Sequence, residues 1–176
     1  MSINFDIIKG LYVMKKFATI FLVLFLSSLF LSPIALSAKL TEDSPIGYWK
    51  TIDDVTGKPK AIIQIWQSPD KLLFGRIVKV FQRPMNNPHL LCTACDGEKH
   101  NQRIIGMTIL ENLKQTKDST SKWIDGSILD PKNGKTYHSN MRLVEQGEKL
   151  QVRGYIGIPL FGRSQTWVRV ANAEDN

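Results

Sequence analysis

The chain has 176 residues and a formal net charge of +7, with 43% hydrophobic and 22% charged residues. This length fits one domain with a packed core. The basic residues are spread between apolar positions rather than gathered in one dense stripe, and this distribution argues against a nucleic-acid-binding protein.

Residues 1–38 have the pattern of a secretory signal peptide. Lys15 and Lys16 form a positive flank before an uncharged apolar run, and small residues close the segment, with cleavage expected after Ser37 or Ala38. An uncleaved membrane anchor is the alternative, because a run of about 18 apolar residues can span a bilayer. Serines and a proline interrupt the run here, and this interruption favours cleavage.

Cleavage would leave one mature domain over residues 39–176 that has no stable membrane span. Met14 lies directly before the two lysines and is expected to be the true start of the protein. The pattern therefore predicts export to the periplasm or to the extracellular space.

Short runs of alternating apolar and polar residues, separated by turn signals, follow along the mature domain. The Asn-Gly pair at 133–134 and the glycine within 145–149 mark tight hairpin turns. No run has the length and period of a helix that could cover a sheet, so closing the sheet on itself is the natural way to protect its edges. The predicted strands are 47–53, 61–67, 72–81, 104–114, 122–130, 135–145, 149–157 and 163–170.

Strands at this spacing are typical of an antiparallel barrel or sandwich, and we expect an all-β fold, a small antiparallel barrel of about eight strands. The interior of such a barrel holds side chains or one small ligand. Since the domain is short for this architecture, side chains are expected to fill most of the interior.

One long irregular segment, 82–103, carries both cysteines of the chain. A disulfide between Cys92 and Cys95 is the simplest interpretation in an oxidising compartment. A redox-active pair would need a helix N-terminus in a βαβ setting, which the sequence does not predict here. A third interpretation is a metal site, because His89 and His100 flank the cysteines and would complete a tetrahedral set of ligands.

The first and last predicted strands carry a recognisable pair of motifs. Gly47-Tyr-Trp49 resembles the Gly-x-Trp that opens lipocalin-type barrels, and "TWVRV" at 166–170 supplies a late arginine, Arg169. In calycin-like barrels such an arginine packs across the first-strand tryptophan. The resemblance therefore implies that Arg169 stacks on Trp49 and closes one end of the barrel.

A longer match runs through "GYWKTIDDVTGKPKAIIQI", "LFGRIV", "CTAC", "IIGMTIL", "DPKNGKTY", "KLQVRGYIG" and "RSQTWVR". Together these stretches, over about 46–170, resemble the family of small exported bacterial proteins catalogued as domain of unknown function 2147. The resemblance implies a lipocalin-like (calycin-like) β-barrel of the cell envelope or secreted fraction, and it implies no particular activity.

Strand parity suggests where a ligand would lie. Arg163, Gln165, Trp167 and Arg169 share one strand face, so if Trp167 and Arg169 point inward the other two do as well. Such a lumen suits a hydrophobic or amphipathic molecule, and its cationic groups suit an anion such as a fatty acid. The alternative leaves the arginines as solvated surface charges. The residues expected to bind the ligand are Trp66, Tyr137, Arg153, Tyr155, Arg163, Gln165 and Trp167.

The sequence carries no G-x-S-x-G, no H-E-x-x-H and no phosphate-binding glycine loop. We therefore expect a non-enzymatic protein without a cofactor, which binds a small hydrophobic or amphipathic molecule. One alternative is a structural or interaction module of the cell envelope with a filled core. Another is a metal-binding protein that uses the loop containing His89, Cys92, Cys95 and His100.

Overall fold

The computed structural model describes residues 44–81, 87 and 89–175. The predicted signal peptide, its cleavage point and the expected start at Met14 lie outside these residues. Within the described part, no helix has the length and hydrophobicity needed to cross a membrane.

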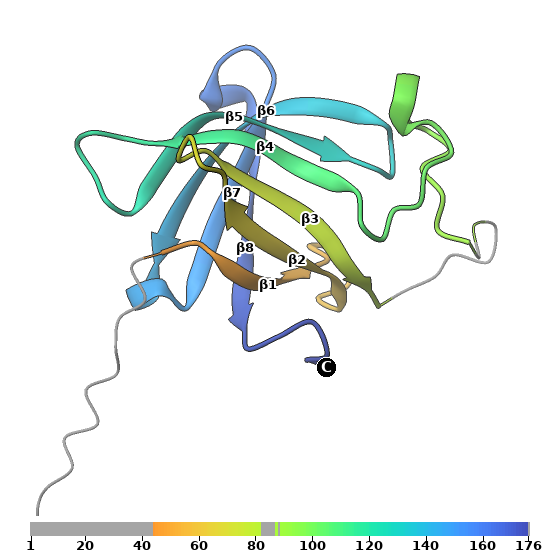
Figure 1. The fold of residues 1–176 in the computed structure, drawn as a ribbon, viewed down its shortest axis with the longest axis horizontal. Helices are drawn as coiled ribbons and strands as arrows, with labels where there is room; N and C mark the ends of the chain where they lie inside the picture. Colours follow the sequence, from red (N-terminus) through yellow and green to blue (C-terminus); the bar gives the residue numbers. More distant parts are fainter. Residues whose placement is uncertain (1–43, 82–86, 88, 176) are drawn as a thin grey trace, which may run out of the picture. The chain divides into compact units, whose positions relative to one another are not determined.

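The described residues form a closed barrel of eight antiparallel strands, in which β1 pairs with both β2 and β8 (Figure 1). This architecture confirms the predicted all-β barrel. In chain order the strands are β1 (Gly47–Ile52), β2 (Pro59–Gln67), β3 (Leu73–Val80), β4 (Thr108–Gln115), β5 (Lys122–Asp130), β6 (Lys135–Val144), β7 (Lys149–Tyr155) and β8 (Gly162–Val170).

The fourth strand starts later than the sequence predicts, at Thr108 rather than at residue 104. The Ile104 amide donates to the Leu90 carbonyl at 2.7 Å, and the Gly106 amide donates to the Ile77 carbonyl at 2.7 Å. These bonds bind 104–106 to the preceding loop and to β3, so the segment cannot join the β4 ladder.

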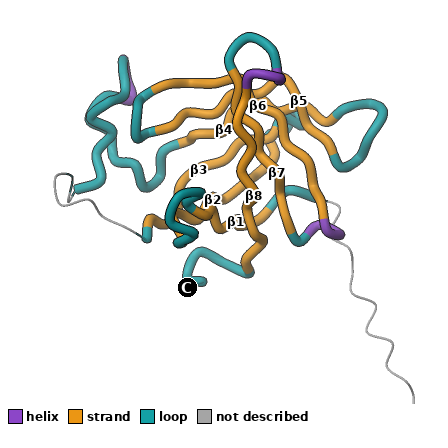
Figure 2. The backbone as a smooth tube through the Cα atoms, turned by 180° about the vertical axis from the view of Figure 1, so that it is seen from behind, coloured by secondary structure: helices purple, strands orange, loops and turns teal. Residues whose placement is uncertain are grey.

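The up-and-down order places the strand connections at two opposite ends of the barrel (Figures 1 and 2). The β1–β2, β3–β4, β5–β6 and β7–β8 connections share one end, here called the mouth. The β2–β3, β4–β5 and β6–β7 turns share the other end, here called the floor, together with residues 44–46 and 171–175.

Side chains fill the floor half of the barrel. Large residues from different strands are buried there, among them Trp49, Ile65, Leu73, Leu110, Leu113, Trp123, Met141 and Leu150. Asn112 in β4 and Asp125 in β5 interrupt the regular strand conformation within this packed region, since both have φ of 61°. Short polar side chains such as these tolerate that conformation. An added Cβ at Gly126 would lie 2.3 Å from Leu113 Cγ, so glycine is required where these strands meet.

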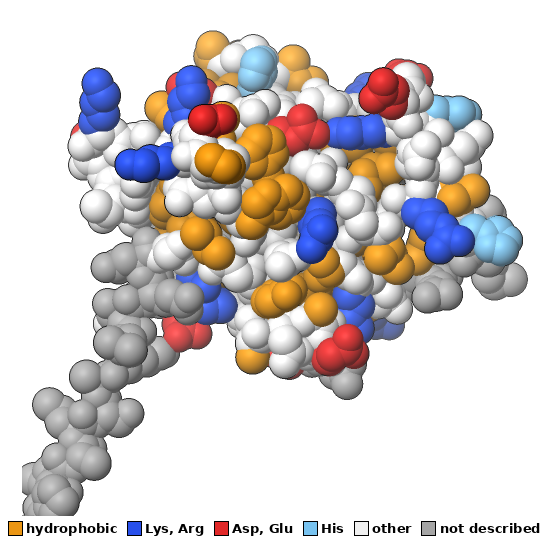
Figure 3. Space-filling view, viewed as in Figure 1, with side chains coloured by type: hydrophobic (Ala, Val, Ile, Leu, Met, Phe, Trp, Pro, Cys, Tyr) orange, Lys and Arg blue, Asp and Glu red, His pale blue; other side chains and the backbone are white. Residues whose placement is uncertain are grey.

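Charged side chains on the outer surface are dispersed. Figure 3 shows Lys and Arg separated by neutral and acidic side chains on the face in view, with no continuous basic stripe on that face. The expectation that these charges form an ordinary solvated surface fits this distribution.

Candidate functional site

The floor is closed by contact between the first and last strands. Trp49 pairs directly with Arg169 in the β1–β8 ladder, and the guanidinium carbon lies 4.3 Å from the centre of the indole ring. Trp49 is 0% exposed, and its indole Nε1 donates to the Pro45 carbonyl at 2.8 Å. The structure thus places the expected pair at the closed end of the barrel, where cation and aromatic face attract each other.

Arg169 also binds three backbone carbonyls around the floor. Its Nε donates to Gly147 at 2.7 Å, its Nη2 to Ser44 at 2.6 Å and its Nη1 to Ile46 at 3.2 Å. A planar guanidinium can reach these acceptors from one position, which an ammonium cannot. Arg169 therefore joins the entering chain to the β6–β7 turn, which makes the pair a structural element rather than a ligand site.

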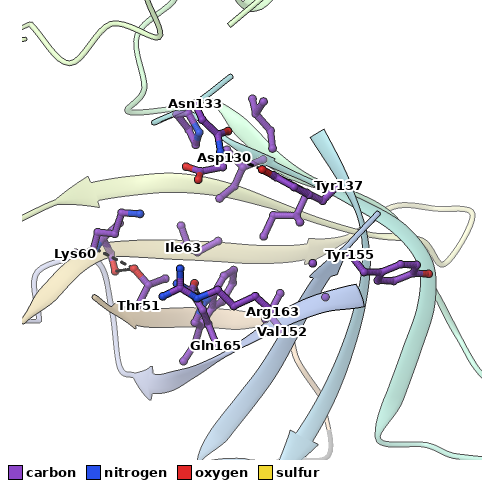
Figure 4. A pocket seen from close by; sticks show the side chains of 18 of the residues that line it. Thr51, Lys60, Ile63, Asp130, Asn133, Tyr137, Val152, Tyr155, Arg163 and Gln165 are labelled. Atoms are coloured by element: carbon purple, nitrogen blue, oxygen red, sulfur yellow. Dashed lines mark hydrogen bonds between the residues drawn. The ribbon is translucent and has the colours of Figure 1, made fainter. Parts of the chain in front are cut away.

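Above the filled floor lies a cavity of about 540 Å³ that opens at the mouth (Figure 4). Its volume falls in the range of about 300–1,000 Å³ typical of small-molecule sites. The expectation of a mostly filled lumen therefore holds for the floor half only. The apolar part of the wall includes Ala61, Ile63, Ile77, Ile109, Ile128, Val152 and Trp167.

Polar side chains of β8 lie on one side of the cavity and bind to the β1–β2 turn. Arg163 forms an ion pair with the Asp54 carboxylate, and Gln165 Nε2 donates to the same Oδ2 atom at 2.9 Å. The Trp167 indole in turn donates to Gln165 Oε1 at 3.4 Å. Figure 4 shows Arg163 and Gln165 directed from β8 toward Thr51 and Ile63. Because Asp54 neutralises Arg163, this side of the cavity is less cationic than the sequence suggests.

The turn that carries Asp54 is itself held by a neighbouring carboxylate. Asp53 Oδ1 accepts from the Thr56 amide at 2.8 Å, from the Thr56 hydroxyl at 2.9 Å and from the Val55 amide at 3.1 Å. These Thr56 bonds lower the pKa of Asp53 below its ordinary value. The charged carboxylate thus holds the turn through these hydrogen bonds, and the turn places Asp54 in reach of Arg163.

Two of the expected ligand residues have their side chains on the outer face of the barrel, and for these the prediction is wrong. Trp66 is on the outer face, where its ring stacks on Phe74 at 5.8 Å and Arg76 lies 5.7 Å from its centre. Arg153 alternates with Val152, which lines the cavity, so Arg153 points outward. Its guanidinium binds the β7–β8 connection instead.

The two expected tyrosines lie at the rim of the cavity. Tyr137 lines the wall, and its hydroxyl accepts from Asn133 Nδ2 at 3.0 Å. Tyr155 also borders the cavity, but its ring stacks on His138 at 5.4 Å and points away from the interior in Figure 4. Of the expected set, Tyr137, Arg163, Gln165 and Trp167 direct side chains at the cavity, whereas sequence reasoning missed Asp54.

The segment with both cysteines packs against the mouth. Cys92 and Cys95 form a disulfide, and both are nearly completely buried. Gly134, in the β5–β6 turn, has φ of 70°, and a Cβ there would lie 1.7 Å from the Ala94 carbonyl oxygen. The bridged loop therefore lies directly on a turn whose residues Asp130 and Asn133 border the cavity.

The metal and redox interpretations of this loop find no support. The two sulfur atoms bond to each other, and His100 Nδ1 lies 2.8 Å from the Cys95 carbonyl oxygen. Among residues 44–81, 87 and 89–175, no group of three His, Cys, Asp or Glu side chains is placed to hold a metal ion. The only helical element just after the cysteines is the three-residue 3₁₀ turn η2 (Gly97–Lys99), too short to resemble a thioredoxin setting.

Replacing both Cys92 and Cys95 with alanine should leave the barrel folded and lower its free energy of unfolding by no more than about 2 kcal/mol. The bridge closes a loop with a sequence separation of only 3. Closing so short a loop removes little conformational entropy from the unfolded chain, so the bridge adds little to the free energy of unfolding. Urea unfolding followed by circular dichroism measures the change. Wild-type protein in reductant keeps both buried sulfur atoms and should lose no more stability than the variant, and a loss of about 4 kcal/mol or more would contradict a purely local role.

The comparisons with known proteins agree with this geometry. Among solved structures, the chain is similar to protein HP1028 from the human pathogen Helicobacter pylori, described as belonging to the lipocalin family. The TM-score is 0.61 at 15% sequence identity, over 74% of this chain and 86% of that one. At this identity the likeness concerns the fold, and it confirms a lipocalin-like barrel. No curated protein matches the chain.

The model of one protein family matches residues 47–169, a span that begins at the first strand of the barrel and ends at Arg169. This agrees with the resemblance read from the sequence motifs. The chain therefore belongs to the family described as uncharacterized proteins conserved in bacteria (DUF2147).

Proposed function

We propose that this protein is a non-enzymatic binding protein of the periplasm or extracellular space, which holds one small hydrophobic or amphipathic molecule in its barrel. The observation that carries the proposal is the hollow mouth half of a barrel whose floor half is tightly packed. A module with only a structural role would gain stability by filling this space, since unfilled apolar volume is destabilising.

The distribution of polarity in the cavity supports a ligand with an apolar body. Ile63, Ile77 and Ile128 line its wall, while the Arg163–Asp54 pair and the Lys60 side chain border it at the mouth. An apolar chain would bury its surface among the isoleucines, and a polar head would remain among the hydrogen-bonding groups at the rim. Because Asp54 already pairs with Arg163, the head need not be an anion.

The disulfide supports the proposed location. Bridges between cysteines persist in oxidising compartments such as the periplasm and are rare in the cytosol. The predicted signal peptide points to the same compartment.

Native mass spectrometry of the protein released from its own periplasm, without detergent, tests the function. We expect the folded barrel to carry one small organic molecule, which is lost under denaturing conditions and can then be identified. Protein unfolded and refolded without lipid serves as the apo control. A bare chain mass from the native compartment, or a retained metal ion with reduced cysteines, would contradict the proposal.

A further inference from the structure

The β7–β8 connection exposes an unusual group of apolar side chains. Ile156 is 65% exposed, Ile158 54%, Leu160 76% and Phe161 73%. They lie within six consecutive residues, and Figure 3 shows hydrophobic side chains at the top of the molecule, where Figure 1 places this connection. Apolar side chains gathered in this way mark an interaction surface more often than single exposed ones do.

Hydrogen bonds hold this connection in its exposed form. Arg153 Nε donates to the Pro159 carbonyl at 2.7 Å, its Nη2 to the Leu160 carbonyl at 3.3 Å and its Nη1 to Ser164 Oγ at 2.9 Å. Pro159 opens the short 3₁₀ turn η4 (Pro159–Phe161), which fixes the backbone further. The backbone of the connection is thus fixed while its four apolar side chains remain exposed.

The exposed group is continuous with the cavity. Ile156, Leu160 and Phe161 line its mouth. A molecule that enters or leaves the barrel at this point would pass along these side chains. The nearby turns are also basic, since Lys and Arg outnumber Asp five to three over 53–60, 130–135 and 156–163.

We propose that the β7–β8 connection docks on an anionic phospholipid surface, so that the mouth of the barrel faces the lipid. Leu160 and Phe161 would insert at the boundary of head groups and acyl chains, while the surrounding lysines meet the anionic head groups. Such docking would let an apolar ligand pass between bilayer and cavity without crossing water. The occupant is a lipid surface rather than a folded partner, because the exposed side chains belong to a short connection, extend the apolar wall of the cavity and lie beside turns with an excess of basic residues.

Sedimentation with phosphatidylcholine vesicles containing phosphatidylglycerol tests this docking. We expect mature wild-type protein to bind these vesicles, more weakly at high salt and more weakly to pure phosphatidylcholine. The double variant Leu160→Ser/Phe161→Ser should bind at least about tenfold less. Ile46→Ser, at the floor and 41% exposed, is the matched control and should bind like wild type.

A second variant reports the depth of insertion. In Phe161→Trp, quenching by brominated phospholipid should exceed that of wild type, in which Trp49, Trp123 and Trp167 are buried and only Trp66 is half-buried. Equal binding of wild type and the double serine variant, or no binding of wild type to anionic vesicles, would overturn the proposal. A dimer in solution that the double variant dissolves would overturn it as well, because the group would then pack against a second copy.

Discussion

Replacing Trp49 with alanine should lower the free energy of unfolding by about 3–5 kcal/mol, the largest loss expected from any single substitution at the floor. Trp49 is completely buried at the junction of β1 and β8, and the change leaves a cavity there. It also removes the indole bond to Pro45 and the stacking partner of Arg169. Domains of this size are stable by about 5–15 kcal/mol, so much of that stability would be lost.

Urea unfolding followed by circular dichroism measures this loss, with Trp66→Ala as the matched control. Trp66 is half-buried on the outer face and stacks on Phe74, so its removal should cost only about 1–2 kcal/mol. An equal cost for both variants would contradict the role of Trp49 in closing the floor. A double-mutant cycle of Trp49→Phe with Arg169→Gln would then isolate the coupling of the pair, expected near 1 kcal/mol.

The pair at the floor of this barrel could be predicted because Gly47-Tyr-Trp49 and the late Arg169 resemble the motifs of calycin-like barrels, and the topology agrees with that resemblance. Trp49 is in the first strand and Arg169 in the last, and closing an up-and-down sheet must bring these strands together. The register that places these two residues opposite each other also keeps the buried side chains of Thr51 and Trp167 on the inner face of their strands. A slip by one residue would turn every inward side chain outward.

The cavity is less predictable because the alternation of apolar and polar residues does not identify the inner face of a strand when both of its faces are apolar. In β2, Ile63 and Ile65 point inward, but Ile62 and Trp66 on the other face are also apolar. Nothing in the alternation of 61–67 says which set faces the lumen, so the sequence does not reveal that Trp66 lies on the outer face. The error at Arg153 has another cause, since apolar Val152 beside it already indicates that Arg153 points outward.

Asp54 could not be assigned from the sequence because its role depends on a contact that forms only when the first and last strands pair. It follows Asp53 in a hydrophilic turn, where acidic residues are common for local reasons. Its partner Arg163 is 109 positions away, and only the closed sheet brings the β1–β2 turn beside the start of β8. The ion pair removes the main argument for an anionic head group, while the predicted hydrophobic or amphipathic ligand stays a proposal.

Replacing Ile128 with tryptophan should weaken the binding of cis-parinaric acid, a fluorescent fatty acid, by at least about tenfold. Ile128 packs against the core from β5, is only partly buried and lines the cavity wall. A larger side chain there has open space to occupy and would exclude part of the bound chain. Each methylene kept out of the cavity loses about 0.8 kcal/mol of binding free energy. The exclusion of two or three methylenes would therefore weaken the affinity by roughly 15- to 60-fold.

Fluorescence titration of delipidated protein measures this change, and Ile124→Trp provides the matched control. Ile124 lies on the same strand but outside the core cluster, beyond the irregularity at Asp125 that shifts the alternation of β5. Its variant should bind the probe within about twofold of wild type, since the new ring adds nothing to the cavity. Circular dichroism confirms that both variants fold. Equal affinities for the two variants would mean that the probe binds elsewhere, and that the hollow half of the barrel is not the ligand site.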